Sequence, residues 1–438
     1  MGLFTLVVYG VGDMVGAGIY GTIGVAAGFM GNAVWLAFVI SMVAALLTGL
    51  SYASLGSRYP KAGGAAYVTY RAYKKPFLSY VIGLAVAASG LTSMAAGTRV
   101  FAATLNGTFP TLPVFAIIVG FLLFLTVINV VGIRESMVAN LICTIVEVGG
   151  LLFIIAVGMK YWGSVDYLKV PEGSSGLTAT MLLSGAVLTF YAFVGFEDML
   201  NVSEEVKNPE HTMPWGILIA LCVATLLYIA VSITAVSVVP AQDLADATKG
   251  APMTQITASA APWVPAWVYN VITLFAVANT ALLNYVMGSR MLYGMARQGL
   301  VPSVIGKVSP TFRTPHLAIL TLGILVLILV FTGDISALAS ATSLLLLASF
   351  CLVNGSLIVL KRRKGEPPGR FEIPSIIPLL GLLVCLVLIV ARVTDVNNHR
   401  APLIAAVIIA GLSLMYAIMR PKGSVEKIGE TSDSEHEA

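Results

Sequence analysis

One carboxylate, Asp13, lies among glycines in an apolar run that extends from Leu3 to about Met30; these glycines occupy positions 10, 12, 16, 18, 21 and 24. The run can cross a bilayer, because about 20 apolar residues suffice. Glycine, however, destabilises a helix by about 1 kcal/mol relative to alanine. Backbone freed at membrane depth is tolerated only where it lines a cavity or is buried in protein. The sequence therefore predicts a helix that breaks near residues 12–18 and forms a binding site there.

A second apolar run, residues 177–202, is interrupted by Gly185, Gly195 and the acidic pair Glu197-Asp198. Two glycine-broken spans five segments apart indicate a transporter built from two inverted five-helix repeats. Close packing of neighbouring helices against Gly12 and Gly16 is the alternative explanation of the first set of glycines.

The elements that position these residues are long apolar helices. The chain of 438 residues is 58% hydrophobic and 11% charged, whereas soluble domains carry roughly 25% charged residues. The runs are also too long for barrel strands, so we predict an all-α polytopic membrane protein. We expect twelve transmembrane helices, at about 3–29, 33–56, 77–104, 113–131, 137–159, 177–202, 214–239, 266–289, 316–332, 335–360, 374–391 and 401–419.

The loops give the orientation. Most of the 25 lysines and arginines fall in alternate loops, which places those loops and both termini in the cytoplasm. The outward loop 240–265 is expected to hold a short surface helix. Residues 421–438 are expected to form a disordered cytoplasmic tail, because almost nothing apolar follows Ile428. We expect a multi-pass protein of the plasma (inner) membrane.

Asp13 has several possible roles, because an ionisable side chain at membrane depth is a functional candidate. In the first alternative Asp13 is protonated, because burial disfavours the charged form of a carboxyl group. It is also a candidate to bind a cationic group of the substrate, or to select an amine that lacks a carboxylate. Pairing with Arg99 is a purely structural alternative.

Several motifs of the chain resemble the amino acid–polyamine–organocation (APC) superfamily. They are Gly16-Ala-Gly-Ile-Tyr, Phe190-Tyr-Ala-Phe-Val-Gly-Phe-Glu, Ser203-Glu-Glu-Val-Lys-Asn-Pro, Arg58-Tyr-Pro-Lys-Ala-Gly-Gly and Arg290-Met-Leu-Tyr-Gly-Met-Ala-Arg. The pattern is most similar to bacterial amino acid permeases akin to cationic amino acid transporters. The resemblance implies a LeuT-type fold: inverted repeats at 1–162 and 177–364, broken near 12–18 and 190–196, followed by two C-terminal helices within 373–420.

The resemblance also implies a substrate site. The α-carboxylate would be bound by backbone amides of Ala17, Gly18 and Ile19, where the first helix restarts, and helix N-termini are suited to anions. Backbone carbonyls would hold the α-amino group, and the family places them at Met14, Tyr191 and Val194. Tyr191 would also cover the substrate, with simple packing in the bundle as the alternative.

Glu147 and Glu197 are the other buried acids. In an ungapped match to the family, Glu147 falls where some proton-coupled relatives carry a lysine. We favour proton coupling there, with a structural acid or a sodium ligand as alternatives. Asn279 stands where a sodium site would need a hydroxyl, and it is a candidate to hydrogen-bond Glu147. Glu197 matches an acid that follows the second break, with capping or protonation as its role.

Together these features favour a secondary active transporter of amino acids, driven by protons or by exchange. A carrier of polyamines or other organic amines is the alternative. A channel would need a polar pore, and none is evident. An enzyme would need a catalytic set, but the histidines lie in loops, at helix ends or in the tail. We expect no catalytic residues, metal, cofactor or nucleic acid. The expected partners are a small-molecule substrate, a proton in preference to sodium, and the lipid bilayer.

Overall fold

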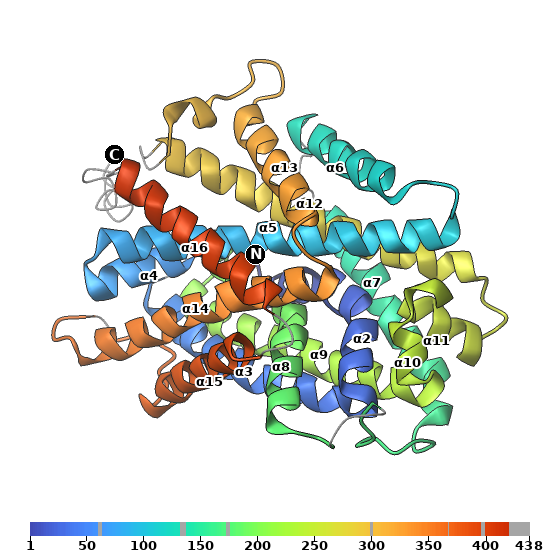
Figure 1. Ribbon diagram of the computed structural model, residues 1–438. Helices are drawn as coiled ribbons and strands as arrows, with labels where there is room; N and C mark the ends of the chain where they lie inside the picture. The colour runs from blue at the N-terminus through green and yellow to red at the C-terminus, as the bar shows by residue number, and fades with distance from the viewer. Residues whose placement is uncertain are drawn as a thin grey trace.

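The apolar runs form helices in the computed structural model, which describes residues 1–59, 64–131, 137–171, 176–297, 301–366, 368–395 and 399–419. The tail predicted at 421–438 lies outside the described residues. Within the described ranges there is no strand, so the all-α prediction is correct (Figure 1).

The first half of the chain folds into a broken helix and then longer ones. The elements are α1 (Leu3–Met14), α2 (Ala17–Met30), η1 (Gly31–Ala33), α3 (Val34–Arg58), α4 (Gly64–Tyr73), α5 (Pro76–Thr108), α6 (Val114–Val131), α7 (Met137–Gly158) and η2 (Met159–Tyr161). Those whose labels begin with η are short 3₁₀ turns or helices.

The second half again begins with a broken helix. Its elements are α8 (Ala179–Phe190), η3 (Tyr191–Phe193), η4 (Phe196–Glu205), α9 (Pro209–Val238), α10 (Ala241–Ala245), η5 (Ala247–Lys249), α11 (Pro252–Ala260), α12 (Ala266–Arg297), η6 (Ser303–Gly306), α13 (His316–Val330), α14 (Ile335–Arg362), α15 (Ile376–Val393) and α16 (Arg400–Met419). The loop 240–265 thus contains short helices, as expected.

Each predicted segment coincides with one of these helices or with a pair separated by a break. By length and composition, nine helical stretches of the described chain are able to cross a membrane. The shorter apolar helices are Leu3–Met14, Ala179–Phe193 and His316–Val330, and two of these are halves of the broken runs. The chain is therefore a polytopic helical membrane protein.

Local sequence explains several of the helix starts. Pro76, Pro209 and Pro252 occupy the first turns of α5, α9 and α11, where the missing N–H costs no hydrogen bond. The side chain of Asp334 caps α14 by accepting the Ala337 N–H at 2.8 Å. Pro214 does not begin a helix, although our predicted segment 214–239 starts there, because α9 already starts at Pro209.

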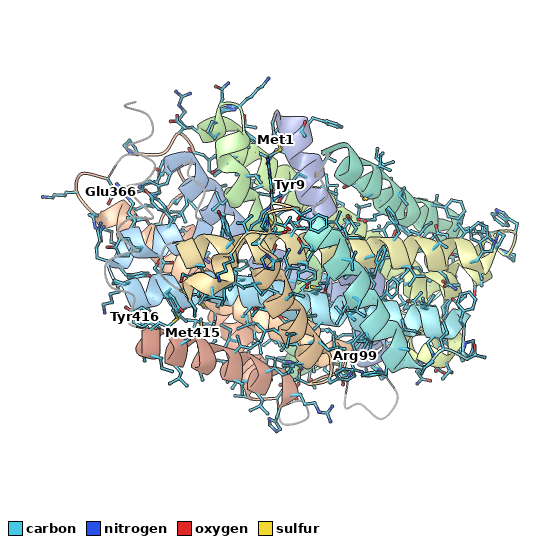
Figure 2. The ribbon with its side chains drawn as sticks, turned by 90° about the horizontal axis from the view of Figure 1, so that it is seen from above. Met1, Tyr9, Arg99, Glu366, Met415 and Tyr416 are labelled. Carbon is cyan, nitrogen blue, oxygen red and sulfur yellow. The ribbon has the colours of Figure 1, made fainter. Side chains whose placement is uncertain are left out.

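The core of the molecule forms where α3 packs along α9 and where α5 packs against α12 and α14. Figure 1 shows α5 crossing the molecule, with α4 beside one end of it. The last helix, α16, packs on the start of α5 through Tyr416, whose ring centroid lies 5.2 Å from those of Phe77 and Tyr80. Met415 adjoins the same cluster (Figure 2). Peripheral helices such as α6 and α16 keep large apolar side chains exposed, as expected for surfaces that face lipid.

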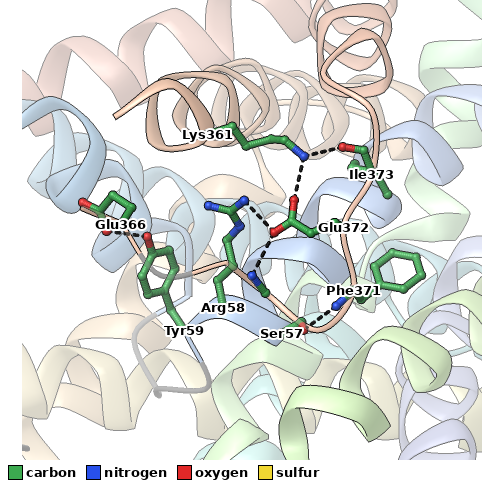
Figure 3. A network of polar contacts seen from close by, with 9 residues as sticks. Ser57, Arg58, Tyr59, Lys361, Glu366, Phe371, Glu372 and Ile373 are labelled. Carbon is green, nitrogen blue, oxygen red and sulfur yellow. Dashed lines mark hydrogen bonds and ion pairs between the residues drawn. The ribbon is translucent and has the colours of Figure 1, made fainter. Parts of the chain in front are cut away.

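A network of hydrogen bonds and ion pairs connects the segment between α14 and α15 to the ends of α3 and α4 (Figure 3). Glu372 pairs with Arg58 at 2.5 Å and with Lys361 at 2.7 Å. Glu366 accepts hydrogen bonds from Tyr59 at 2.7 Å and from Arg71 at 2.9 Å. These contacts lie on the side that the charge pattern assigns to the cytoplasm.

Candidate functional site

The first helix break consists of Val15 and Gly16, between the end of α1 and the start of α2. It lies inside the interval that the glycines predicted. A Cβ at Gly16 would lie 2.0 Å from the Thr280 hydroxyl, so only glycine lets α12 come this close. Tyr20 makes the first backbone bond of α2, to the Gly16 carbonyl. The N–H groups of residues 17–19 thus precede the helical ladder and form the start of a helix dipole.

The second break consists of Val194 and Gly195, between η3 and η4. Gly195 has a φ of +125°, a conformation that residues with a Cβ rarely adopt. Its N–H donates to the Glu197 carboxylate at 3.0 Å. Glu197 therefore caps the restart of the helix, which is one of the two roles expected for it.

The two breaks meet in the centre of the molecule. A Cβ at Gly18 would lie 2.5 Å from Ala192 Cα, and one at Gly195 would lie 3.0 Å from Asp13 Cγ. The Tyr228 hydroxyl of α9 lies 2.8 Å from the Met14 carbonyl and 2.7 Å from the Ala192 carbonyl. One hydroxyl therefore serves the C-terminal end of α1 and the break of the second helix at once.

A small cavity lies at this meeting point. Its lining combines predicted residues with others from α5 and α12: Asp13, Met14, Gly18, Ser93, Tyr191, Val194, Gly195, Asp198, Thr280 and Asn284. It has room for about one water molecule. A larger ligand must displace side chains to enter. The cavity is therefore closed in this conformation.

Tyr191 lines the cavity, and hydrogen bonds hold its hydroxyl in place. Its hydroxyl lies 3.1 Å from both the hydroxyl and the carbonyl oxygen of Ser93. Asn284 connects this contact to α12, because its amide donates to the Thr280 carbonyl at 3.0 Å and lies 3.5 Å from the Ser93 hydroxyl. Sequence reasoning did not identify Ser93, Asn284 or Tyr228 as site residues. Of these three, only Asn284 had a signal in the sequence: it follows Thr280 by one helical turn, so both polar side chains lie on the same face of one helix.

Asp13 is partly exposed to this cavity. Arg99 does not pair with it, in contrast to one alternative from the sequence. The Arg99 guanidinium donates to the carbonyl of Val330, at the end of α13, at 2.7 Å. Among the ion pairs of the described residues, none involves Asp13.

Glu147 lies on α7 and is fully buried. Asn279 donates to its Oε1 at 3.2 Å, so the hydrogen bond that we considered in place of a sodium site is present. Its second oxygen, Oε2, has no hydrogen-bond partner in the described part of the chain. Tyr20 of α2 donates to the Glu147 backbone carbonyl at 2.6 Å. The backbone of α7 at this buried acid is therefore hydrogen-bonded to α2, the restarted half of the first helix.

The predicted site residues thus fall into four places. Asp13, Met14, Gly18, Tyr191 and Val194 line the central cavity. Ala17 and Ile19 lie in the first turn of α2, and the N–H of Ala17 is 3.3 Å from the Thr280 hydroxyl. Glu147 and Asn279 form a separate pair, whereas Glu197 lines a second cavity together with Asp198.

Two broken helices that meet at a cavity inside an apolar bundle define a class of helical membrane protein with a central polar site. Comparison with known proteins identifies its family. Residues 1–418 match the amino acid permease family, and the chain belongs to it.

Individual relatives cover most of the chain. It is 30% identical to the branched-chain amino acid permease BcaP of Bacillus subtilis, over 89% of this chain and 87% of that protein. It is 31% identical to the vacuolar cationic amino acid transporter 4 of Arabidopsis thaliana, over 81% of this chain and 62% of that protein. It is also 29% identical to the methylthioribose transporter of Bacillus subtilis, over 87% of this chain and 86% of that protein.

Proposed function

We propose that the protein is a secondary active transporter that moves amino acids across the plasma membrane by alternating access. The meeting of two helix breaks at one closed polar cavity is the observation that carries this proposal. Relatives named as branched-chain and cationic amino acid carriers support the substrate class. Alternating access moves one group of helices against another around such a central site.

In the proposed binding mode, the substrate carboxylate is bound by the N–H groups of Ala17, Gly18 and Ile19. The carbonyls of Met14, Tyr191 and Val194 hold its amino group. The position of Gly18 and Val194 in the cavity lining supports this assignment. Tyr191 must turn away from Ser93 before the cavity admits a substrate.

We further propose twelve membrane spans, with both termini in the cytoplasm, in the LeuT arrangement. The repeats would comprise residues 1–162 and 177–364, followed by two helices within 373–420. The pairing of α3 with α9 and of α5 with α12 supports this division. Each pair joins segments five apart in the chain, as expected for elements near a shared two-fold axis.

We assign the coupling proton to Glu147, because a buried carboxylate with an unpartnered oxygen is costly as an ion. The neutral, protonated group avoids that cost. The bond from Tyr20 to the Glu147 backbone carbonyl holds this part of α7 next to α2, so the carboxyl lies beside the restarted half of the first helix. Sodium binding is the weaker proposal, since the Asn279 amide already donates to Glu147.

A carrier of polyamines or other organic amines is the alternative function. Asp13 favours it, since a partly exposed carboxylate in the cavity can bind an ammonium group. The two functions differ in the predicted effect of Asp13→Asn. An amine carrier loses most of its affinity, whereas a carrier that binds α-amino acids through the backbone of its broken helices retains it.

The test is the melting temperature of the detergent-purified protein against a panel of amino acids, polyamines and simple amines. A ligand that binds only the folded state stabilises it by about 2.7 kcal/mol at a hundred times its Kd. Stabilisation by α-amino acids supports the proposal. If only amines that lack a carboxylate stabilise the protein, the amine carrier replaces the amino acid transporter as the proposed function. If no ligand of the panel stabilises it, both functions are contradicted.

A further inference from the structure

A second cavity lies next to the central one, between η4 and the start of α4. Its lining includes Tyr52 of α3, Gly64 of α4, Gly83 of α5, Glu197 and Asp198 of η4, and Met291 of α12. We call it the cytoplasmic chamber, because α4 belongs to the side that the charge pattern assigns to the cytoplasm. Asp198 lines both this chamber and the central cavity, so it forms part of the wall between them.

The chamber is roomier than the central cavity. Its volume is about 60 Å³, against about 10 Å³ in the centre. Several small residues line it, namely Gly64, Ala65, Ala66 and Gly83. The chamber therefore has room for a group the size of a water molecule or an ammonium ion.

One polar group in the chamber points to a ligand. The Tyr52 hydroxyl has no hydrogen-bond partner in the described chain, although the residue is only 1% exposed. The acidic residues Glu197 and Asp198 line the same chamber. Buried hydroxyls are nearly always hydrogen-bonded, so an unpartnered one beside a cavity indicates a missing partner.

The chemistry of the lining selects that partner. Two carboxylates and a phenol oxygen are all able to accept hydrogen bonds, and an ammonium group offers three donors and a positive charge. An ionised carboxylate instead has no hydrogen-bond donor to offer these acceptors.

We propose that the cytoplasmic chamber is a second substrate subsite, which binds the amino group of a substrate between the central cavity and the cytoplasm. The inference rests on the proposed transport function. In this account, substrate leaving the centre passes its ammonium group along Asp198 to Glu197 and Tyr52. Substrate entering from the cytoplasm meets these groups first.

Transport measured separately from each face tests the subsite. Radiolabelled L-leucine and L-lysine serve as probes in right-side-out and inside-out membrane vesicles. The variant is Tyr52→Phe, which removes the hydroxyl and keeps the ring contacts with Phe196 and Phe350. We expect the half-saturation concentration to rise about tenfold from the cytoplasmic face and to stay unchanged from the outer face.

The matched control is Tyr269→Phe, which removes a hydroxyl bonded to the Gly150 carbonyl at 3.0 Å, away from the chamber. It should leave the ratio between the two faces unchanged. A second variant, Gly83→Ala, narrows the chamber and should act on the cytoplasmic face alone, as Tyr52→Phe does.

Two results would overturn the subsite: an equal effect of Tyr52→Phe on both faces, which marks a structural role, or no effect on either face. In both cases the wild-type protein still transports, so the proposed function stands. A wild-type protein that moves neither probe would instead contradict transport of branched-chain and cationic amino acids, and the subsite for their amino group with it.

Discussion

Gly18 of α2 and Ala192 of η3 touch so closely that a Cβ on Gly18 would lie 2.5 Å from the Cα of Ala192. Contact between the two broken helices thus depends on the absence of one methyl group. We predict that Gly18→Ala forces the helices apart, lowers stability by about 1–3 kcal/mol and reduces substrate affinity at least tenfold. Ligand-dependent melting measures both effects.

Gly120→Ala on α6 is the control for this substitution, since nothing lies within 4 Å of a Cβ at that position. It should leave both stability and affinity close to those of the wild type. A Gly18→Ala protein that binds substrate as tightly as the wild type would show that the contact does not shape the site.

Tyr228→Phe removes the hydroxyl that serves both the Met14 and the Ala192 carbonyls. Two buried acceptors then lose their partner, so we expect a loss of about 1–3 kcal/mol in unfolding free energy and slower transport from both faces. Thermal unfolding and vesicle uptake measure these quantities. Unchanged transport in a stable Tyr228→Phe protein would argue against a shared role of the two carbonyls.

Glu147→Gln keeps an acceptor for Asn279 but removes the titratable proton. We predict that uptake is no longer accelerated by an inward proton gradient, whereas exchange of labelled for unlabelled substrate continues. Glu210→Gln is the control, because Glu210 pairs with Arg370 at the surface. Persistent acceleration by the gradient in Glu147→Gln would assign the proton to another group.

The network of Figure 3 predicts a loss of stability in acid. Partial burial acts to raise the pKa of Glu366, but hydrogen bonds from Tyr59 and Arg71 outweigh it and lower the pKa. In the same way, burial acts to raise the pKa of Glu372, whereas contacts with Lys361, the Gly369 N–H and Arg58 lower it.

Because both pKa values are lower when folded, the stabilisation is present above the ordinary value of about 4.3. It is lost as the pH falls through the folded values. The double variant Glu366→Gln/Glu372→Gln should melt a few degrees lower than the wild type at neutral pH, and the gap should shrink in acid. Parallel melting curves across the acid range would contradict this.

Much of the fold followed from simple patterns. The length of the apolar runs predicted every long helix. The density of glycines predicted a break near residues 12–18, and Val15 and Gly16 separate the two helices within that interval. The short helix α4 was missed, because its residues Gly64–Tyr73 are neither long nor apolar enough to stand out within a polar loop.

The site was less accessible to sequence reasoning. The backbone at Met14, Gly18 and Val194 is marked by local glycines and by the family motifs. Ser93 and Asn284 come from helices whose rotation is set by packing, which a single sequence does not fix. Arg99 illustrates the same limit. Its partner, the carbonyl of Val330, lies far away in the sequence and is brought near by the fold.

The most direct test of the account is uptake of radiolabelled amino acids by proteoliposomes that contain the purified protein, with Gly18→Ala and Gly120→Ala beside it. The account predicts saturable uptake of at least one α-amino acid, accelerated by an inward proton gradient, reduced in Gly18→Ala and retained in Gly120→Ala. Absence of uptake for every amino acid, or equal uptake by all three proteins, would contradict a substrate site built from the two broken helices.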